Sequence, residues 1–170
     1  MIEIELTQGQ VTYVDDVDAD LAELKWQAHF VPSYANGGNY VVIRSATVAL
    51  LKRRAIYMHR VILGRMLGYE LATHEQVDHV NRNPLDNRRE NLRLATVAQN
   101  NYNHTRQQNS TSGYKGVAWH EKLQRWRAYI YDRKRQVHLG LYDDPVEAAK
   151  IYDFAARDLH GEFAALNFPD

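Results

Sequence analysis

The feature that most constrains this chain is a polar run around an aspartate–histidine pair. Asp78 and His79 lie in the sequence Val-Asp-His-Val-Asn-Arg-Asn, and Asn100 and His104 follow further along the chain. Adjacent side chains of an extended strand point to opposite sides, so Asp78 and His79 can serve two different tasks. The carboxylate can ligate a metal ion, and the imidazole has the ordinary pKa of a base that works near neutral pH.

The second half of this arrangement is the segment 96–104, which we expect to be helical. Asn100 and His104 are four residues apart, so they would share one helical face. Carboxylate and amide oxygens are hard donors that favour Mg²⁺ or Mn²⁺ over Zn²⁺, although the imidazole of His104 keeps a borderline metal open. The sequence therefore predicts one divalent metal ion near Asp78, with His79 taking a proton from an attacking water.

These residues resemble the HNH, or ββα-metal, endonuclease family, in the branch of phage and intron-associated homing enzymes. An Asn-Leu pair begins at Asn91, and Asn100 follows nine residues later, which is the spacing of that family. The resemblance implies that His79 is the general base and that Asp78 and Asn100 hold the metal ion. It also implies that Asn91 pins the loop carrying the histidine through hydrogen bonds to backbone. His104 matches a position that is either a further metal ligand or a phosphate contact.

Charge is distributed unevenly, although the chain as a whole is neutral. Between His104 and Gly140 there are eight Lys and Arg residues but only two acidic residues. From Leu141 to Asp170 there are seven acidic residues and two basic ones. A local basic stripe is typical of nucleic-acid binding, and the alternative is a solvated face of a sheet.

The basic segment resembles an AP2/ERF domain from Gly113 onward. The resemblance is carried by Tyr-Lys-Gly-Val at 114–117, Trp-Arg-Ala at 126–128, His-Leu-Gly at 138–140 and Leu-Asn-Phe-Pro at 166–169. It implies a three-stranded antiparallel sheet in the major groove of double-stranded DNA, with a helix packed behind the sheet. The resemblance implies DNA contacts from Lys115, Trp126, Tyr129, Tyr131 and His138, and charge alone suggests Arg125, Arg127, Arg133 and Arg135. Core packing is the alternative for Trp126.

The remaining patterns predict an α+β fold in three parts. Residues 1–57 read as a small β-rich accessory module, with a short helix at 16–25 and strands at 2–6, 11–13, 40–44 and 55–57. A helix at 58–67, in which we expect His59 to be a packing residue, begins a central ββα-metal nuclease domain at 58–104. Polar residues form a linker at 105–112.

The last part, 113–170, is predicted to be the AP2-like domain. Its three strands are expected near 115–120, 126–131 and 136–141. Its helix should begin after the N-cap Asp144 and end at Gly161. The apolar stripe expected to face the sheet consists of Val146, Ala149, Tyr152, Ala156 and Leu159.

The sequence excludes several classes of protein. It has no cysteine for disulfides or thiolate metal sites, no run of membrane-spanning length and no signal peptide, so we expect a cytoplasmic protein of a bacterial or phage-infected cell. We predict a site-directed HNH endonuclease of homing or phage type, targeted to double-stranded DNA by its AP2-like domain. We expect a monomer or weak dimer. One active site per chain makes a monomer a nicking enzyme, whereas a double-strand cut would require a dimer. The alternative is an AP2-type DNA-binding regulator with a catalytically silent HNH fold.

Overall fold

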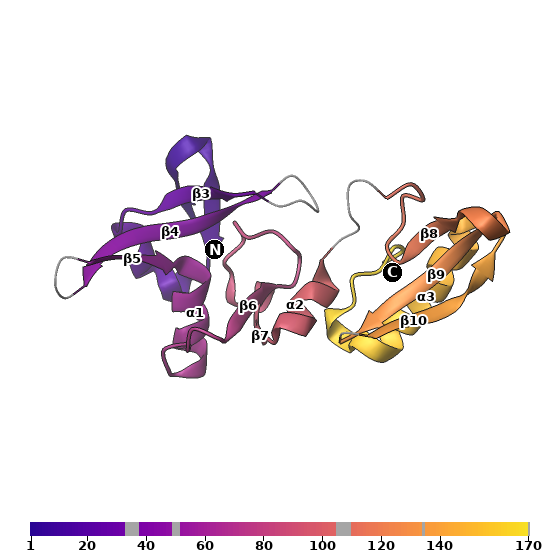
Figure 1. The fold of residues 1–170 in the computed structure, drawn as a ribbon. Coiled ribbons are helices and arrows are strands. Elements are labelled where there is room, and N and C mark those ends of the chain that lie inside the picture. The colour runs from indigo at the N-terminus through magenta and orange to yellow at the C-terminus, as the bar shows by residue number, and fades with distance from the viewer. Residues whose placement is uncertain (33–37, 49–51, 105–109, 134, 170) are drawn as a thin grey trace. The chain divides into compact units, whose positions relative to one another are not determined.

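The computed structural model of this chain describes residues 1–32, 38–48, 52–104, 110–133 and 135–169 (Figure 1). It has the mixed α and β structure, built from small antiparallel sheets, that the sequence predicts. The described residues form two compact units, the first ending at Thr96 and the second beginning at Val97, and each is described by itself. Residues 105–109 of the expected linker lie outside the described residues. None of the helices described is long and apolar enough to cross a membrane.

The first unit begins with a hairpin and a three-stranded sheet. Strands β1 (Ile2–Glu5) and β2 (Val11–Val14) pair with each other, and η1 (Thr7–Gly9) lies between them. The helix expected at 16–25 is the 3₁₀ helix η2 (Asp16–Glu23). Strands β4 (Asn39–Val48) and β5 (Lys52–Tyr57) pair as predicted, and β3 (Gln27–Val31), which the sequence did not predict, joins them in the order β3-β4-β5.

Helix α1 joins that sheet to a second hairpin. It spans Met58–Leu67, as predicted, and Gly68 ends it in the left-handed conformation with φ of 79°. The hairpin consists of β6 (Gln76–His79) and β7 (Leu92–Ala95), with the short η4 (Arg89–Asn91) before β7. In Figure 1, α1 lies between the β3-β4-β5 sheet and this hairpin. Its apolar side chains share one core with residues of β2, β4 and β7.

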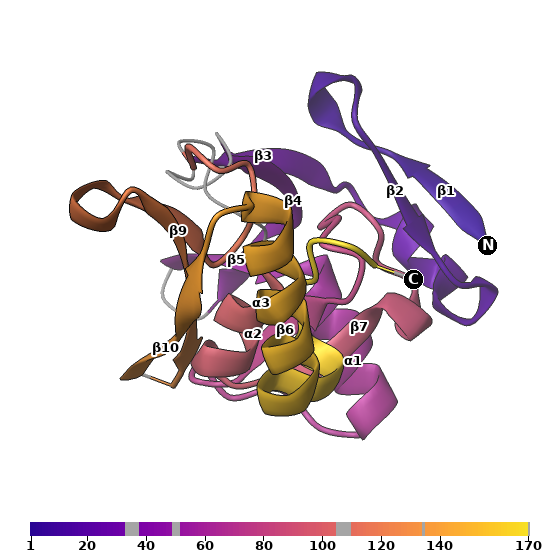
Figure 2. The ribbon, with the colours of Figure 1, turned by 90° about the vertical axis from the view of Figure 1, so that its right-hand side faces the viewer.

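The second unit contains α2 (Val97–Asn103) and a sheet backed by a long helix. The sheet has the order β10-β9-β8, formed by β8 (Val117–His120), β9 (Arg125–Asp132) and β10 (Arg135–Tyr142), with η5 (Glu121–Leu123) between β8 and β9. Helix α3 (Pro145–His160) packs against this sheet and is followed by η6 (Gly161–Phe163) (Figure 2). The predicted caps are confirmed, because the Asp144 side chain accepts a hydrogen bond from Val146 N at 2.9 Å and Gly161 follows the helix.

Small residues allow α3 to lie close to the sheet. Ala149 and Ala156 are fully buried, and Tyr152 fills the space beside Gly116. A Cβ at Gly116 would lie 2.0 Å from Cδ2 of Tyr152, and its φ of +73° also disfavours a side chain, so glycine is required there. Leu159 was wrongly assigned to the sheet-facing stripe, because its side chain is 42% exposed.

Candidate active site

The β6-β7 hairpin of the first unit presents the aspartate–histidine pair. Asp78 is paired in register with Arg93, and His79 with Leu92. Arg93 donates from Nε to Asp78 Oδ2 at 2.8 Å, and its Nη2 lies 2.7 Å from the same oxygen. The side chains of Asp78 and His79 are both buried. A buried carboxylate usually has a charged partner. The guanidinium of Arg93 supplies that partner.

His79 is oriented by an amide. Its Nε2 lies 3.4 Å from Oδ1 of Asn87, and the amide nitrogen of Asn87 donates to Thr12 Oγ1 at 2.8 Å. The amide oxygen only accepts, so this contact is a hydrogen bond in the tautomer whose Nε2 carries the proton, and that tautomer leaves the lone pair on Nδ1. Burial lowers the pKa of His79, although the Asn87 bond and the carboxylates of Asp78 and Asp86 act in the opposite direction. His79 is therefore held in the form that can accept a proton.

His59 contacts the same imidazole. Its ring lies edge-on to that of His79 with centroids 5.3 Å apart. Burial, together with the charges of His79 and Arg60, lowers the pKa of His59 to about 3. His59 was expected to be a packing residue of α1. In the structure its ring packs against His79, the predicted base.

Asn91 fastens the loop between the two strands. Its Oδ1 accepts from the backbone N of Asn81 at 2.8 Å, and its Nδ2 donates to the carbonyl of Asp86 at 2.7 Å. The carbonyl of Asn91 also accepts from Val80 N at 2.9 Å. These bonds have the form that the HNH resemblance implies for this residue.

Strand β2 forms further hydrogen bonds to the same loop. Thr12 Oγ1 donates to the carbonyl of Leu85 at 2.6 Å. The backbone of Tyr13 donates to Leu85 at 3.1 Å and accepts from Asn87 at 2.9 Å. Neither Asn87 nor Thr12 was among the site residues predicted from the sequence, yet both are fully buried behind His79. The available signal was the dense run of Asn and Asp residues at 81–87, whose side chains need partners when buried.

The remaining predicted ligands belong to the second unit. Asn100 is half-buried on α2, and His104 is exposed immediately after that helix. No group of three or more His, Cys, Asp or Glu side chains that could hold a metal is found in the described part of the chain. The metal site predicted from the sequence does not require a group of this kind, because its oxygen ligands are the carboxylate of Asp78 and the amide of Asn100. Mg²⁺ is commonly held by one or two protein oxygens together with phosphate and water, so the donor chemistry fits.

One face of the second unit's sheet carries several of the predicted DNA contacts. Arg125, Arg127, Tyr129 and Tyr131 alternate along β9 with residues that face α3, and His138 is paired in register with Tyr129. The guanidinium of Arg127 lies 5.1 Å from the ring centroid of Tyr129. Arg125, on the same face, instead forms an ion pair with Asp143 at 2.7 Å.

Four predicted DNA contacts lie elsewhere. Trp126 is partly buried and packs against the core on the α3 side of the sheet and against Trp119, which favours the packing alternative for this residue. Lys115 Nζ donates to the carbonyls of Tyr102 and His104 at 2.5 and 2.6 Å. Arg133 and Arg135 flank the β9-β10 turn, with Arg133 at a φ of 54°.

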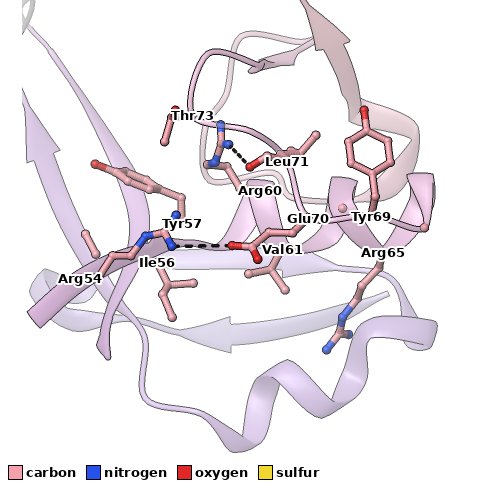
Figure 3. A pocket seen from close by; sticks show the side chains of 13 residues that line it. Arg54, Ile56, Tyr57, Arg60, Val61, Arg65, Tyr69, Glu70, Leu71 and Thr73 are labelled. Carbon is pink, nitrogen blue, oxygen red and sulfur yellow. Dashed lines mark hydrogen bonds and ion pairs between the residues drawn. The ribbon is translucent and has the colours of Figure 1, made fainter. Parts of the chain in front are cut away.

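A pocket of about 960 Å³ lies beside α1 in the first unit, and Figure 3 shows its lining. Its arginines have protein partners. Arg60 donates to the carbonyls of Leu71, Ala72 and Glu75, and Arg54 lies 3.7 Å from Glu70. None of the predicted site residues lines this pocket, so it supplies no part of the site.

Comparison with known families gives one match over the predicted nuclease residues and one over the predicted DNA-binding residues. The HNH endonuclease family matches residues 56–102, and the AP2 domain family matches residues 112–162. The HNH match therefore extends across the boundary at Thr96 and includes nearly all of α2. No solved structure matches the chain.

Several viral and plant proteins are similar to the chain. Protein 3.8 of Escherichia phage T7 is 35% identical over 88 residues, which are 52% of this chain and 72% of that protein. An uncharacterized HNH endonuclease, L560, of Acanthamoeba polyphaga mimivirus is 34% identical over 65% of this chain and 56% of its own length. APETALA2-like protein 2 of rice is 40% identical over 34% of this chain but only 13% of its own length. The chain belongs to the same family as phage T7 protein 3.8 and combines an HNH endonuclease domain with an AP2 domain.

Proposed function

We propose that this protein is a metal-dependent DNA endonuclease of the homing or phage type, which its AP2 domain directs to chosen sites. The observation that carries the proposal is the buried His79, whose Nε2 faces Asn87 and whose neighbour on β6 is Asp78. A neutral imidazole beside a carboxylate supplies a base and a metal ligand, which phosphodiester hydrolysis requires.

In this mechanism the protein's side chains hold the catalytic histidine in place and accept one proton. His79 accepts the proton of the attacking water at Nδ1, while Asn87 holds its Nε2 and Asn91 holds the loop that follows it. Asp78 and Asn100 would hold one divalent ion, Mg²⁺ or Mn²⁺, and His104 would be a further ligand or a phosphate contact. The bound ion supplies positive charge to the scissile phosphate and the leaving 3′ oxygen. We expect a 5′ phosphate and a 3′ hydroxyl.

The AP2 domain would bind double-stranded DNA through the face that carries Arg127, Tyr129, Tyr131 and His138. Arginine contacts to phosphate give affinity, and contacts to base edges in the major groove give sequence preference. Because each chain has one HNH domain, we expect a monomer or weak dimer to nick a single strand.

One observation favours a second candidate, a DNA-binding regulator with a silent HNH fold. The oxygen Oδ2 of Asp78 is bonded to Arg93, and a bound guanidinium competes with a metal ion for the same carboxylate. An ordinary cleavage assay separates the two candidates.

The direct test is incubation of the purified protein with supercoiled plasmid DNA carrying cloned segments of its source genome. We expect conversion of supercoiled to open-circular DNA with Mg²⁺ or Mn²⁺ and none with EDTA, because the scissile phosphate needs a cation. Agarose electrophoresis measures the conversion, and linear product at early times would contradict single-strand nicking. Intact DNA with every divalent ion, together with retained DNA binding, would favour the regulator.

The DNA-binding face can be tested by the variant Arg127→Ala. We expect weaker binding to double-stranded DNA and a salt dependence of log Kd whose slope is smaller by about one, since one phosphate contact is lost. Arg125→Ala is the matched control, because Arg125 lies on the same strand face but is paired with Asp143. Fluorescence anisotropy across a salt series measures both. A larger loss in Arg125→Ala than in Arg127→Ala would show that the contact has been assigned to the wrong arginine.

A further inference from the structure

Helix α2 is too short to be stable by itself. It has seven residues, and isolated helices of fewer than about 12 residues are marginal in water. Its conformation therefore depends on what it packs against. Within the second unit, α2 lies beside η6 at the C-terminal end of α3 (Figure 1).

Tyr102 attaches α2 to the rest of the second unit by two contacts. Its ring stacks on that of His160 with centroids 3.7 Å apart and an angle of 6° between the planes. Its hydroxyl accepts a hydrogen bond from the backbone N of Arg133 at 2.7 Å. One side chain of α2 thus contacts both the end of α3 and the turn between β9 and β10.

The partners of Tyr102 are themselves fixed. His160 is buried, and its Nε2 donates to the carbonyl of Tyr131 on β9 at 2.8 Å. Lys115 adds a second attachment, because its Nζ donates to the carbonyls of Tyr102 and His104, where a cation is favourable at the C-terminal end of a helix. The backbone of Lys115 is held in turn by Asn167, which accepts from its N at 2.7 Å.

These contacts are additional to the core of the AP2 domain. The AP2 match begins at residue 112, after α2 has ended. The apolar clusters between α3 and the sheet are built from residues such as Val117, Ile130 and Tyr152, and Tyr102 is not among their described members. A domain that has its own core does not need Tyr102 in order to fold.

We propose that Tyr102 is a positioning residue that attaches α2, and with it Asn100, to the AP2 domain. Asp78 and His79 belong to the first unit, and Asn100 belongs to the second unit together with the AP2 domain. Seating of the AP2 domain on DNA would also place the amide that the proposed metal site needs, which couples cleavage to correct binding. This inference rests on the proposed nuclease function for its catalytic consequence but not for the attachment itself.

The attachment is tested without any activity, by hydrogen–deuterium exchange of the full chain. In Tyr102→Ala the amides of α2 should exchange about tenfold faster, since an aromatic stack and a hydrogen bond are lost, while the amides of β9 and α3 keep their protection. The matched control is Phe154→Ala, which removes an aromatic ring that is 75% exposed on α3 and should change neither. Unchanged exchange of α2 in Tyr102→Ala would overturn the proposal. Faster exchange throughout β9 and α3 would also overturn it, because Tyr102 would then be a general folding residue.

The catalytic consequence is tested by plasmid cleavage with Mn²⁺ and by DNA binding in EDTA. We expect Tyr102→Ala to lower the cleavage rate about tenfold or more with unchanged DNA binding, and Tyr102→Phe, which keeps the stacked ring, to restore most of the rate. Equal cleavage by Tyr102→Ala, or a parallel loss of DNA binding, would refute the coupling. If the unmodified protein fails to cleave, the nuclease proposal fails, and the exchange experiment still decides whether Tyr102 holds α2.

Discussion

Replacing His79 with alanine should lower the rate of metal-dependent plasmid cleavage by about a thousandfold while the affinity for DNA stays unchanged. General bases contribute roughly 10²- to 10⁴-fold to the reactions that they assist, and no other described imidazole has the environment of His79. His59 has its pKa lowered to about 3 and packs edge-on against His79, so the two rings are not equivalent. The measurement is a single-turnover nicking assay at fixed Mn²⁺ concentration, combined with a binding assay in EDTA.

His74→Ala serves as the control, because His74 is an exposed histidine of the same unit that we assign no role in catalysis. It should cleave like the unmodified protein. A residual rate in His79→Ala above about a tenth of the original would exclude His79 as the base. Equal loss of cleavage and DNA binding, or a lower thermal unfolding midpoint, would instead make His79 a structural residue.

Replacing Asp18 with asparagine should lower the free energy of unfolding by about 2–3 kcal/mol. Asp18 is fully buried, and its two oxygens accept from Arg65 on α1 and from Arg89 at the start of η4. Breaking a buried ion pair typically costs about 3–5 kcal/mol, and we expect less here because both arginines are about one-third exposed and can regain water. Chemical denaturation followed by tryptophan fluorescence measures the difference, since Trp26 lies in the same core.

The effect of Asp18→Asn should depend on pH. Burial alone would raise the pKa of Asp18, but the hydrogen bonds from Arg89 and Arg65 outweigh it and hold the pKa below its ordinary value. The stabilisation is therefore present above the pKa of the unfolded chain, near 4, and is lost as the pH falls through the lower pKa of the folded protein. The difference between the two proteins should shrink in that acidic range. Asp20→Asn, which removes the exposed partner of Arg65, should have a smaller effect, and an equal effect would contradict the importance of burial.

Much of the fold could be predicted because its elements have strong local signals. The α3 helix carries its own caps at Asp144 and Gly161, and the strands of the AP2 sheet alternate between two faces. Strand β3 gave no such signal, since only Ala28 of its five residues is buried and the apolar residues Phe30 and Val31 are exposed. A strand exposed on nearly all its residues lacks the alternation by which strands are recognised.

The candidate site was predictable only where its residues lie close together in the sequence. The spacing of Asp78, His79 and Asn91 identifies the hairpin, but the hydrogen bond from Asn87 to Thr12 joins residues 75 positions apart. Likewise, nothing in the sequence near Tyr102 indicates that it stacks on His160. Such pairs are set by tertiary packing, and a local pattern carries no information about the partner.

The bonds from β2 to the loop at 85–87 bear on how such a chain can be inherited. A recombination event that exchanged the first strands for those of another protein would remove the Thr12 hydroxyl and replace the strand whose backbone bonds to Leu85 and Asn87. The loop behind His79 would then lose the surface against which it is folded. In this family, the N-terminal hairpin and the aspartate–histidine pair should therefore be inherited as one block, with new sequence accepted at other points of the chain.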